Sequence, residues 1–314
     1  MSTVLTSRLP FAETGDVFLT DGGIETTLIF EYGIDLPLFA AFPLLDTKEG
    51  RDALRRYYRT HASIADTHKR GFIFESATWR ASPDWADKLN ISRDKLAELN
   101  RRSIVLMDDL RSEFTGLQSV LSGCIGPRGD GYDPGEIMRV EEAEQYHAFQ
   151  VAAFAEARAD LVTAITITNT PEAVGIVRAA SASDMPVVIS FTVETDGRLP
   201  TGQDLGDAIE EVDARTGAAA AHFMLNCAHP DHFRDTLRQG GSWLERLRGV
   251  RANASRLSHA ELDEAEELDD GDPVETGRDY AELRELLPHL VVLGGCCGTD
   301  HRHIEQACLA TNAA

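Results

Sequence analysis

Three cysteines are the residues whose type and spacing most clearly indicate shared chemistry. Cys296 and Cys297 are neighbours flanked by glycines, and Cys227 lies 69 positions before the pair (296 minus 227). Adjacent cysteines rarely form a disulfide with each other, because the resulting ring is strained. Thiolates are soft ligands that select zinc, and three protein ligands leave a fourth tetrahedral position open. The sequence therefore predicts a zinc site formed by Cys227, Cys296 and Cys297, open to water or a substrate.

The remaining two cysteines, Cys124 and Cys308, are interpreted as buried apolar residues. An odd number of cysteines in a long chain without a signal-type apolar run at its N-terminus indicates thiols or metal ligands rather than a disulfide framework. No stretch approaches the roughly 18 to 20 apolar residues that cross a membrane. We therefore expect a cytoplasmic protein that is not embedded in a membrane.

The elements that must position these thiols are short apolar runs that alternate with helical segments, the pattern of a parallel sheet with crossover helices. Eight runs are predicted as strands: 17–20, 71–75, 120–123, 161–166, 187–191, 223–225, 249–252 and 290–293. Helices are predicted over 48–69, 92–113, 140–157 and 204–216. Eight such units favour a closed barrel over an open sheet. The predicted fold class is α/β, a single (β/α)8 TIM barrel forming one domain over residues 1–314.

In a parallel barrel, the active site is built at the C-terminal ends of the strands. Residues at these ends are therefore the substrate-binding candidates: Asp21, Gly22, Gly23, Glu75, Asn226 and Asn253. Asp21-Gly22-Gly23 is also compatible with a tight turn between strand and helix. Asn226 and Thr299 are expected to donate hydrogen bonds to the sulfurs. Gly294, Gly295 and Gly298 are expected to supply the dihedral angles that aim two successive thiols at one ion.

The roles of three aromatic residues and of one acidic segment that follow the strands are each open to two interpretations. Trp79, Trp85 and Tyr132 either stack on a cationic substrate or pack in the core. The acidic segment 258–272 begins with a capping-box pattern at Ser258 and Glu261. It is predicted mainly as a solvated helix, with a lid over the site as the alternative.

Composition and charge restrict the class of partner. The 314 residues are 43% hydrophobic and 26% charged, which suffices for a large core, and the formal net charge is -22. Such a charge repels phosphate backbones and anionic membrane surfaces. The expected partners are small molecules and not nucleic acid, and the expected assembly is a monomer or a small homo-oligomer.

Six segments, spread over most of the chain, resemble the homocysteine S-methyltransferase family. They read DGGIETTL, GCIGPRGDGY, ADLVTAITITNTPEA, SFTVETDGRLPTG, LNCAHP and GGCCGTDHRHI. The resemblance implies a zinc-containing barrel in which three cysteines bind the metal and the substrate thiol takes the fourth position. It also implies a methyl donor that is a small sulfonium, an ammonium compound or a methylfolate, with homocysteine as acceptor and methionine as product.

The expected chemistry needs no catalytic base from the protein. Zinc deprotonates a bound thiol near neutral pH, and methyl transfer then requires in-line positioning of the two substrates. One departure from the family pattern is Ile165, which stands where a Glu contacting the homocysteine amino group is usual; Glu75 or Glu25 is a possible replacement. Three alternatives stay open: another thiol or selenol acceptor, a zinc hydrolase or lyase with Glu75 as base, and a non-catalytic thiol sensor.

Overall fold

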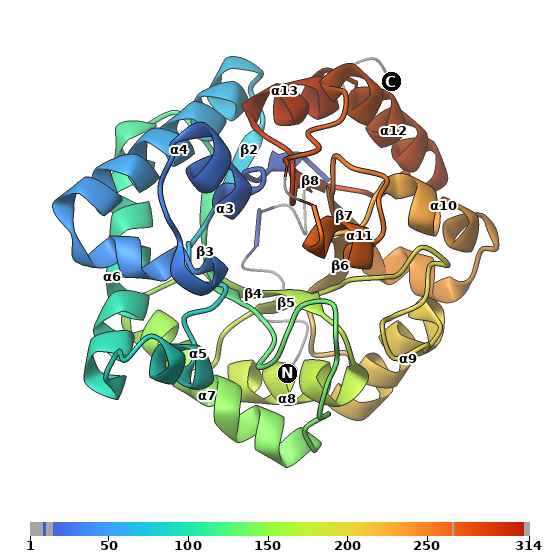
Figure 1. Cartoon of the computed structure of the whole chain (residues 1–314). Coiled ribbons are helices and arrows are strands. Elements are labelled where there is room, and N and C mark those ends of the chain that lie inside the picture. The colour runs from blue at the N-terminus through green and yellow to red at the C-terminus, as the bar shows by residue number, and fades with distance from the viewer. Residues whose placement is uncertain (1–8, 11–14, 266, 311–314) are drawn as a thin grey trace.

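Figure 1 shows the protein, a computed structural model, as a closed barrel of eight parallel strands inside a ring of helices. The structure describes residues 9–10, 15–265 and 267–310. Each strand pairs with the next one along the chain, and β1 closes the barrel by pairing with β8. The predicted (β/α)8 barrel is therefore confirmed. That residues 1–314 form one domain, and the oligomeric state, stay predictions.

All eight predicted strands are present, with bounds that differ by a few residues. They are β1 (Phe18–Leu19), β2 (Gly71–Glu75), β3 (Ser119–Ile125), β4 (Leu161–Ile167), β5 (Val187–Phe191), β6 (His222–Asn226), β7 (Leu247–Ala252) and β8 (Val292–Gly295). The seventh run, whose pattern is interrupted by Arg251, is a strand of six residues paired on both sides.

The four predicted helices correspond to α4 (Lys48–Thr67), α6 (Arg93–Glu113), α7 (Val140–Glu156) and α9 (Leu205–Thr216). Side chains cap two of them: Thr47 accepts a hydrogen bond from the backbone of Gly50, and Ser92 accepts one from that of Lys95. The other α-helices are α3 (Ile24–Thr26), α5 (Pro83–Lys88), α8 (Thr170–Ala182), α10 (Pro230–Arg238), α11 (His259–Asp263), α12 (Pro273–Leu286) and α13 (His301–Ala310). Short π or 3-10 segments are η1 (Thr27–Glu31), η2 (Pro37–Phe39), η3 (Phe42–Asp46) and η4 (Ser242–Arg246). Within the described ranges, no helix has both the length and the hydrophobicity of a membrane span.

Alternation along the strands decides which side chains enter the barrel. In β2, Phe72 and Phe74 join the core between strands and helices, whereas Ile73 belongs to a separate cluster inside the barrel. Glu75 is two residues after Ile73 and therefore also points inward. By the same alternation Val250 of β7 faces the helices and Arg251 faces the interior. An apolar layer thus fills the lower barrel, and polar side chains lie above it near the C-terminal ends.

Candidate functional site

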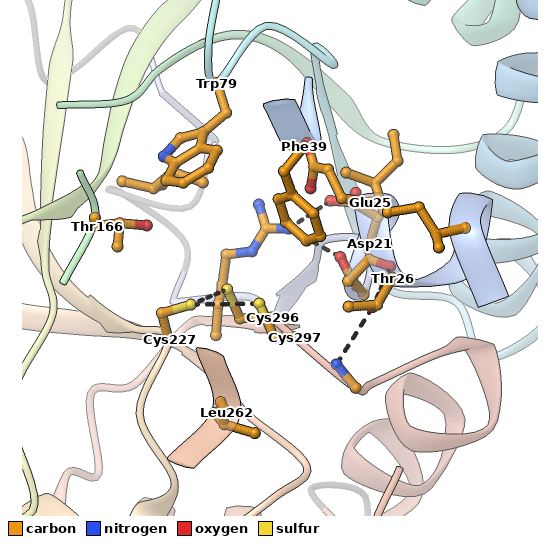
Figure 2. Close-up of a pocket in the computed structure, with 18 of the residues that line it drawn as sticks. Asp21, Glu25, Thr26, Phe39, Trp79, Thr166, Cys227, Leu262, Cys296 and Cys297 are labelled. Carbon is orange, nitrogen blue, oxygen red and sulfur yellow. Dashed lines mark hydrogen bonds and ion pairs between the residues drawn. The ribbon is translucent and has the colours of Figure 1, made fainter. Parts of the chain in front are cut away.

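A cavity of about 460 Å³ opens at the C-terminal ends of the strands. Figure 2 shows Trp79 and Thr166 on one side of it, Glu25 and Phe39 on the other, and the three cysteines between and below them. This is the rim at which parallel barrels carry their active sites. Cys227, Cys296 and Cys297 all line this cavity.

The three sulfur atoms lie within 4.8 Å of one another. The Sγ of Cys227 is 3.0 Å from that of Cys296 and 3.7 Å from that of Cys297. For zinc–sulfur bonds near 2.3 Å, the edge of a tetrahedron is about 3.8 Å. The donor type, the number of ligands and the spacing therefore fit a zinc ion, with the cavity adjoining the cluster.

The backbone explains how distant thiols meet, and it corrects one sequence expectation. Gly298 has a positive φ of 77°, but Gly294 and Gly295 do not, because they continue β8. A side chain at either of these two glycines would collide with the hydroxyl of Thr20 or Thr299, so their role is close packing. Cys227 itself has a left-handed φ of 58°, which the sequence analysis did not anticipate.

The thiols differ in their readiness to ionise. Hydrogen bonds from the other two thiols, and the nearby positive charge of Arg251, hold the pKa of Cys296 well below its usual range. The same sulfur contacts raise the pKa of Cys227 well above the ordinary value. Of these two thiols, Cys296 is therefore the one whose surroundings favour the thiolate.

A buried ion-pair cluster beneath the cavity was missed by the sequence analysis. Arg251 is 5% exposed and contacts Glu75 directly. Its guanidinium also donates to the Asp21 carboxylate at 2.9 Å and to the backbone oxygens of Gly22 and Gly295 at 3.3 and 3.0 Å. Burial would lower the pKa of Arg251, but Asp21 and Glu75 hold it well above the usual value.

This cluster changes the interpretation of two predicted substrate-binding residues. Asp21 and Glu75 line the cavity, but both are paired with Arg251, whose single positive charge offsets one of their two negative charges. Asp21 also accepts a hydrogen bond from Tyr57 at 3.1 Å, and Glu75 one from Ser122 at 3.2 Å. Glu75 is therefore not a free replacement for the missing carboxylate at position 165.

Gly22 and Gly23 form a close-packed turn between β1 and α3. The backbone nitrogen of Gly23 donates to the oxygen of Thr299 at 2.8 Å, so that group is already occupied. A Cβ at Gly23 would lie 2.5 Å from the backbone oxygen of Cys296. Both glycines line the cavity, and their packing brings α3 against the loop that carries the cysteine pair.

Asn226 and Asn253 are not among the residues that line the cavity. Asn226 lies below it, where it binds Thr166 and Ser190, and its amide is 3.8 Å from the sulfur of Cys296. Asn253 is 2% exposed and donates its backbone N–H to Ala228. Thr299, also expected to contact a sulfur, donates instead to the backbone oxygen of Cys296 at 2.7 Å.

Tyr132 connects three loops at the thiol cluster. Its hydroxyl is 3.2 Å from the sulfur of Cys227 and 3.7 Å from that of Cys297. Its ring stacks on His259 with centroids 3.9 Å apart. His259 in turn contacts the backbone oxygen of Cys227 at 2.7 Å and Glu194 at 3.1 Å. Tyr132 therefore contacts the thiol cluster directly, and the predicted stacking on a cationic substrate stays a prediction.

The two tryptophans after β2 have different surroundings. Arg80 lies over both rings, 4.8 Å from the centroid of Trp79 and 3.9 Å from that of Trp85. Trp79 lines the cavity, whereas Trp85 is 7% exposed and also has Lys88 over its ring. Stacking of a cationic substrate on Trp79 stays a prediction, whereas Trp85 packs against side chains of the protein itself.

The acidic segment is more than a solvated helix. It begins with the predicted capping box of Ser258 and Glu261 at α11. Leu262 and Leu268 then line the cavity, so the segment supplies part of its wall. In Figure 1, α11 lies inside the ring of helices near the ends of β6 and β7.

Comparisons with known proteins agree with this architecture. The metallated form of the homocysteine methyltransferase MmuM from Escherichia coli matches with a TM-score of 0.71 and 21% identity, over 95% of this chain and 96% of that one. Its oxidised form gives 0.73 and 18% identity, over 96% and 98% of the two chains. At such identities these matches show the fold. A search of curated proteins found no match. The sequence pattern described as homocysteine S-methyltransferase matches residues 18–311, and the chain therefore belongs to this family of S-methyltransferase enzymes.

Proposed function

We propose that the protein transfers a methyl group from a small sulfonium, ammonium or methylfolate donor to the thiolate of homocysteine and thereby forms methionine. The observation that carries the proposal is the convergence of Cys227, Cys296 and Cys297 within 4.8 Å at an open cavity. These three residues would hold a zinc ion. When bound, zinc supplies the positive charge that favours ionisation of the acceptor thiol near neutral pH.

The residues of the chain position the substrates and exclude water. Trp79 and Phe39 offer aromatic faces in the cavity, and such faces attract methylated cations. The apolar side chains of Leu262 and Leu268 help to exclude water from the reacting groups. A new bond forms between the acceptor sulfur and the methyl carbon, while the bond from that carbon to the donor breaks and leaves its electron pair on the donor. The thiol proton leaves to solvent, so no protein base is needed.

A second acceptor class is favoured by one observation. Ile165 lines the cavity at the position where the family pattern has a carboxylate. A different thiol or a selenol is therefore the alternative acceptor. Zinc-dependent hydrolysis or elimination is less well supported, because Glu75, its candidate base, is paired with Arg251.

The test is a panel of zinc-loaded protein with several thiols crossed with S-methylmethionine, S-adenosylmethionine, betaine and methyltetrahydrofolate. Product would be measured by mass spectrometry. We expect methionine from homocysteine, abolished in Cys297→Ala and retained in Cys308→Ala, whose buried thiol lies in α13. Donor turnover without a thiol, or full activity of Cys297→Ala after zinc removal, would refute the proposal.

A further inference from the structure

The carboxylates that line the cavity differ in whether a cation or a hydrogen-bond donor accompanies them. Asp21 and Glu75 are bound to Arg251, and Asp130 lies 3.6 Å from Arg80. Further along the wall, Asp269 accepts a hydrogen bond from Ser255 at 2.6 Å, and Glu267 is exposed to solvent. Glu25 is only partly exposed, and no described side chain forms an ion pair or hydrogen bond with it.

Glu25 is held close to the thiol cluster by the turn that precedes it. It is the second residue of α3, which begins directly after Gly23, and Gly23 packs against the backbone of Cys296. Burial is the main cause that raises the pKa of Glu25 to about 7, and the charge on Cys296 adds to it. Arg80 opposes this shift but is the smallest of its causes, and it forms its ion pair with Asp130. A further cation beside Glu25 would therefore stabilise its charged form.

On the opposite wall the nearby carboxylate, Asp130, is accompanied by Arg80. Trp79, Ile165 and Thr166 line this wall, and the hydroxyl of Thr166 accepts a hydrogen bond from Asn226 at 2.9 Å. Figure 2 shows Trp79 and Thr166 across the cavity from Glu25, with the cysteines between them. A substrate whose thiol reaches the cysteines can therefore place a cationic group beside Glu25 and an apolar part beside Ile165.

We propose that Glu25 binds the ammonium group of the acceptor and so selects an amino-acid thiol over thiols that lack this group. The inference rests on the proposed function. An ammonium is favoured over the methylated centre of the donor, because an ammonium has N–H groups that donate charge-assisted hydrogen bonds to a carboxylate. A methylated sulfonium or quaternary ammonium has none, and the aromatic faces of Trp79 and Phe39 suit it better.

The test compares homocysteine with 4-sulfanylbutanoate, which is homocysteine without its amino group, on the zinc-loaded protein. Glu25→Gln removes the charge and keeps the shape. We expect its KM for homocysteine to rise about 10- to 100-fold, as for a lost hydrogen bond to a charged group, and its KM for 4-sulfanylbutanoate to change less than about twofold. Glu25→Asp should recover part of the preference. Glu285→Gln, which removes an equal charge from an exposed site on α12, is the matched control.

The possible results separate this inference from the proposed function. An equal rise in KM for both acceptors, or a rise confined to the methyl donor, would overturn the assignment of Glu25 to the acceptor ammonium. Calorimetric binding of both thiols gives a second measurement that does not depend on turnover. Homocysteine that binds selectively through Glu25 but is not methylated would sink the proposed function alone. Equal binding of the two thiols to the wild-type protein would sink the inference, and circular dichroism would show that the variants are folded.

Discussion

Replacing Arg251 by methionine tests the buried ion-pair cluster beneath the cavity. The side chains of Arg251, Asp21 and Glu75 are 6%, 3% and 5% exposed, so water screens their charges only weakly. Removing one partner of a buried ion pair costs about 3 to 5 kcal/mol, because an uncompensated charge is left behind. Arg251→Met leaves two carboxylates in this position. We therefore expect the free energy of unfolding to fall by about 3 to 5 kcal/mol at pH 8.

The loss should depend on pH with a defined sign. Burial already raises the pKa of Glu75, and the removal of Arg251 takes away the charge that opposes this shift. A carboxyl with a raised pKa in the folded state holds more protons than in the unfolded state, so stability falls as pH rises. The deficit of Arg251→Met should consequently be smaller at pH 5.5 than at pH 8.

Urea unfolding at the two pH values measures both effects. Arg59→Met is the surface control, because Arg59 pairs with Glu113 at 2.6 Å where the side chains are 47% and 38% exposed, and such pairs contribute about 1 kcal/mol or less. The double variant Glu75→Gln/Arg251→Met should lose less stability than the sum of its single variants, since both partners are removed together. A cost for Arg251→Met no greater than that of Arg59→Met would refute the reasoning.

Two further variants test other parts of the site region. Tyr132→Phe removes the hydroxyl 3.2 Å from the sulfur of Cys227, and we expect zinc affinity, measured by chelator competition, to fall about tenfold or more; unchanged affinity would contradict the role assigned to Tyr132. Asp300→Ala removes the carboxylate that accepts from the backbone of Arg302 at 2.8 Å and pairs with His303, and it should cost about 1 to 2 kcal/mol at pH 7. Burial opposes the charge, but His303 and Arg302 hold the pKa of Asp300 well below its usual range, so this stabilisation is present above the unfolded pKa of about 3.9 and is lost as pH falls below it. A deficit of the same size at pH 7 and pH 2.5 in urea unfolding would contradict that account.

The fold could be predicted because its signals are local. Each strand is a short apolar run, and eight runs alternating with helices leave few possible topologies. The three thiols could be singled out for the same reason: Cys296 and Cys297 mark their own strand end, and Cys227 directly follows β6. Strand ends in a parallel barrel share one rim, whatever their separation along the chain.

The charge balance of the site could not be predicted in this way. In the sequence, Arg251 only interrupts the apolar pattern of the seventh run, because spacing along the chain does not reveal a partner 176 or 230 residues away. A signal was nevertheless present. Glu75 ends β2 with the inward phase, and Asp21 follows β1 at the same rim. Two buried carboxylates there require a cation. Side chains alternate along β7, and this alternation directs Arg251 into the barrel, where it can serve as that cation.

The backbone conformation and packing of individual residues could also not be predicted from the sequence. The left-handed φ of Cys227 has no local signature, since glycine and asparagine are the residues that usually adopt it. The packing role of Gly294 and Gly295 depends on Thr20 and Thr299, which lie in other segments. Tertiary contacts therefore decided these details.

X-ray absorption at the zinc edge, recorded with and without homocysteine, tests the central claim most directly. Zinc-loaded protein should show three sulfur neighbours near 2.3 Å and one lighter atom, and homocysteine should replace that atom with a fourth sulfur. Cys297→Ala should bind zinc weakly and lose one sulfur from the spectrum. A nitrogen or oxygen neighbour that homocysteine does not displace would contradict the role assigned to Cys227, Cys296 and Cys297.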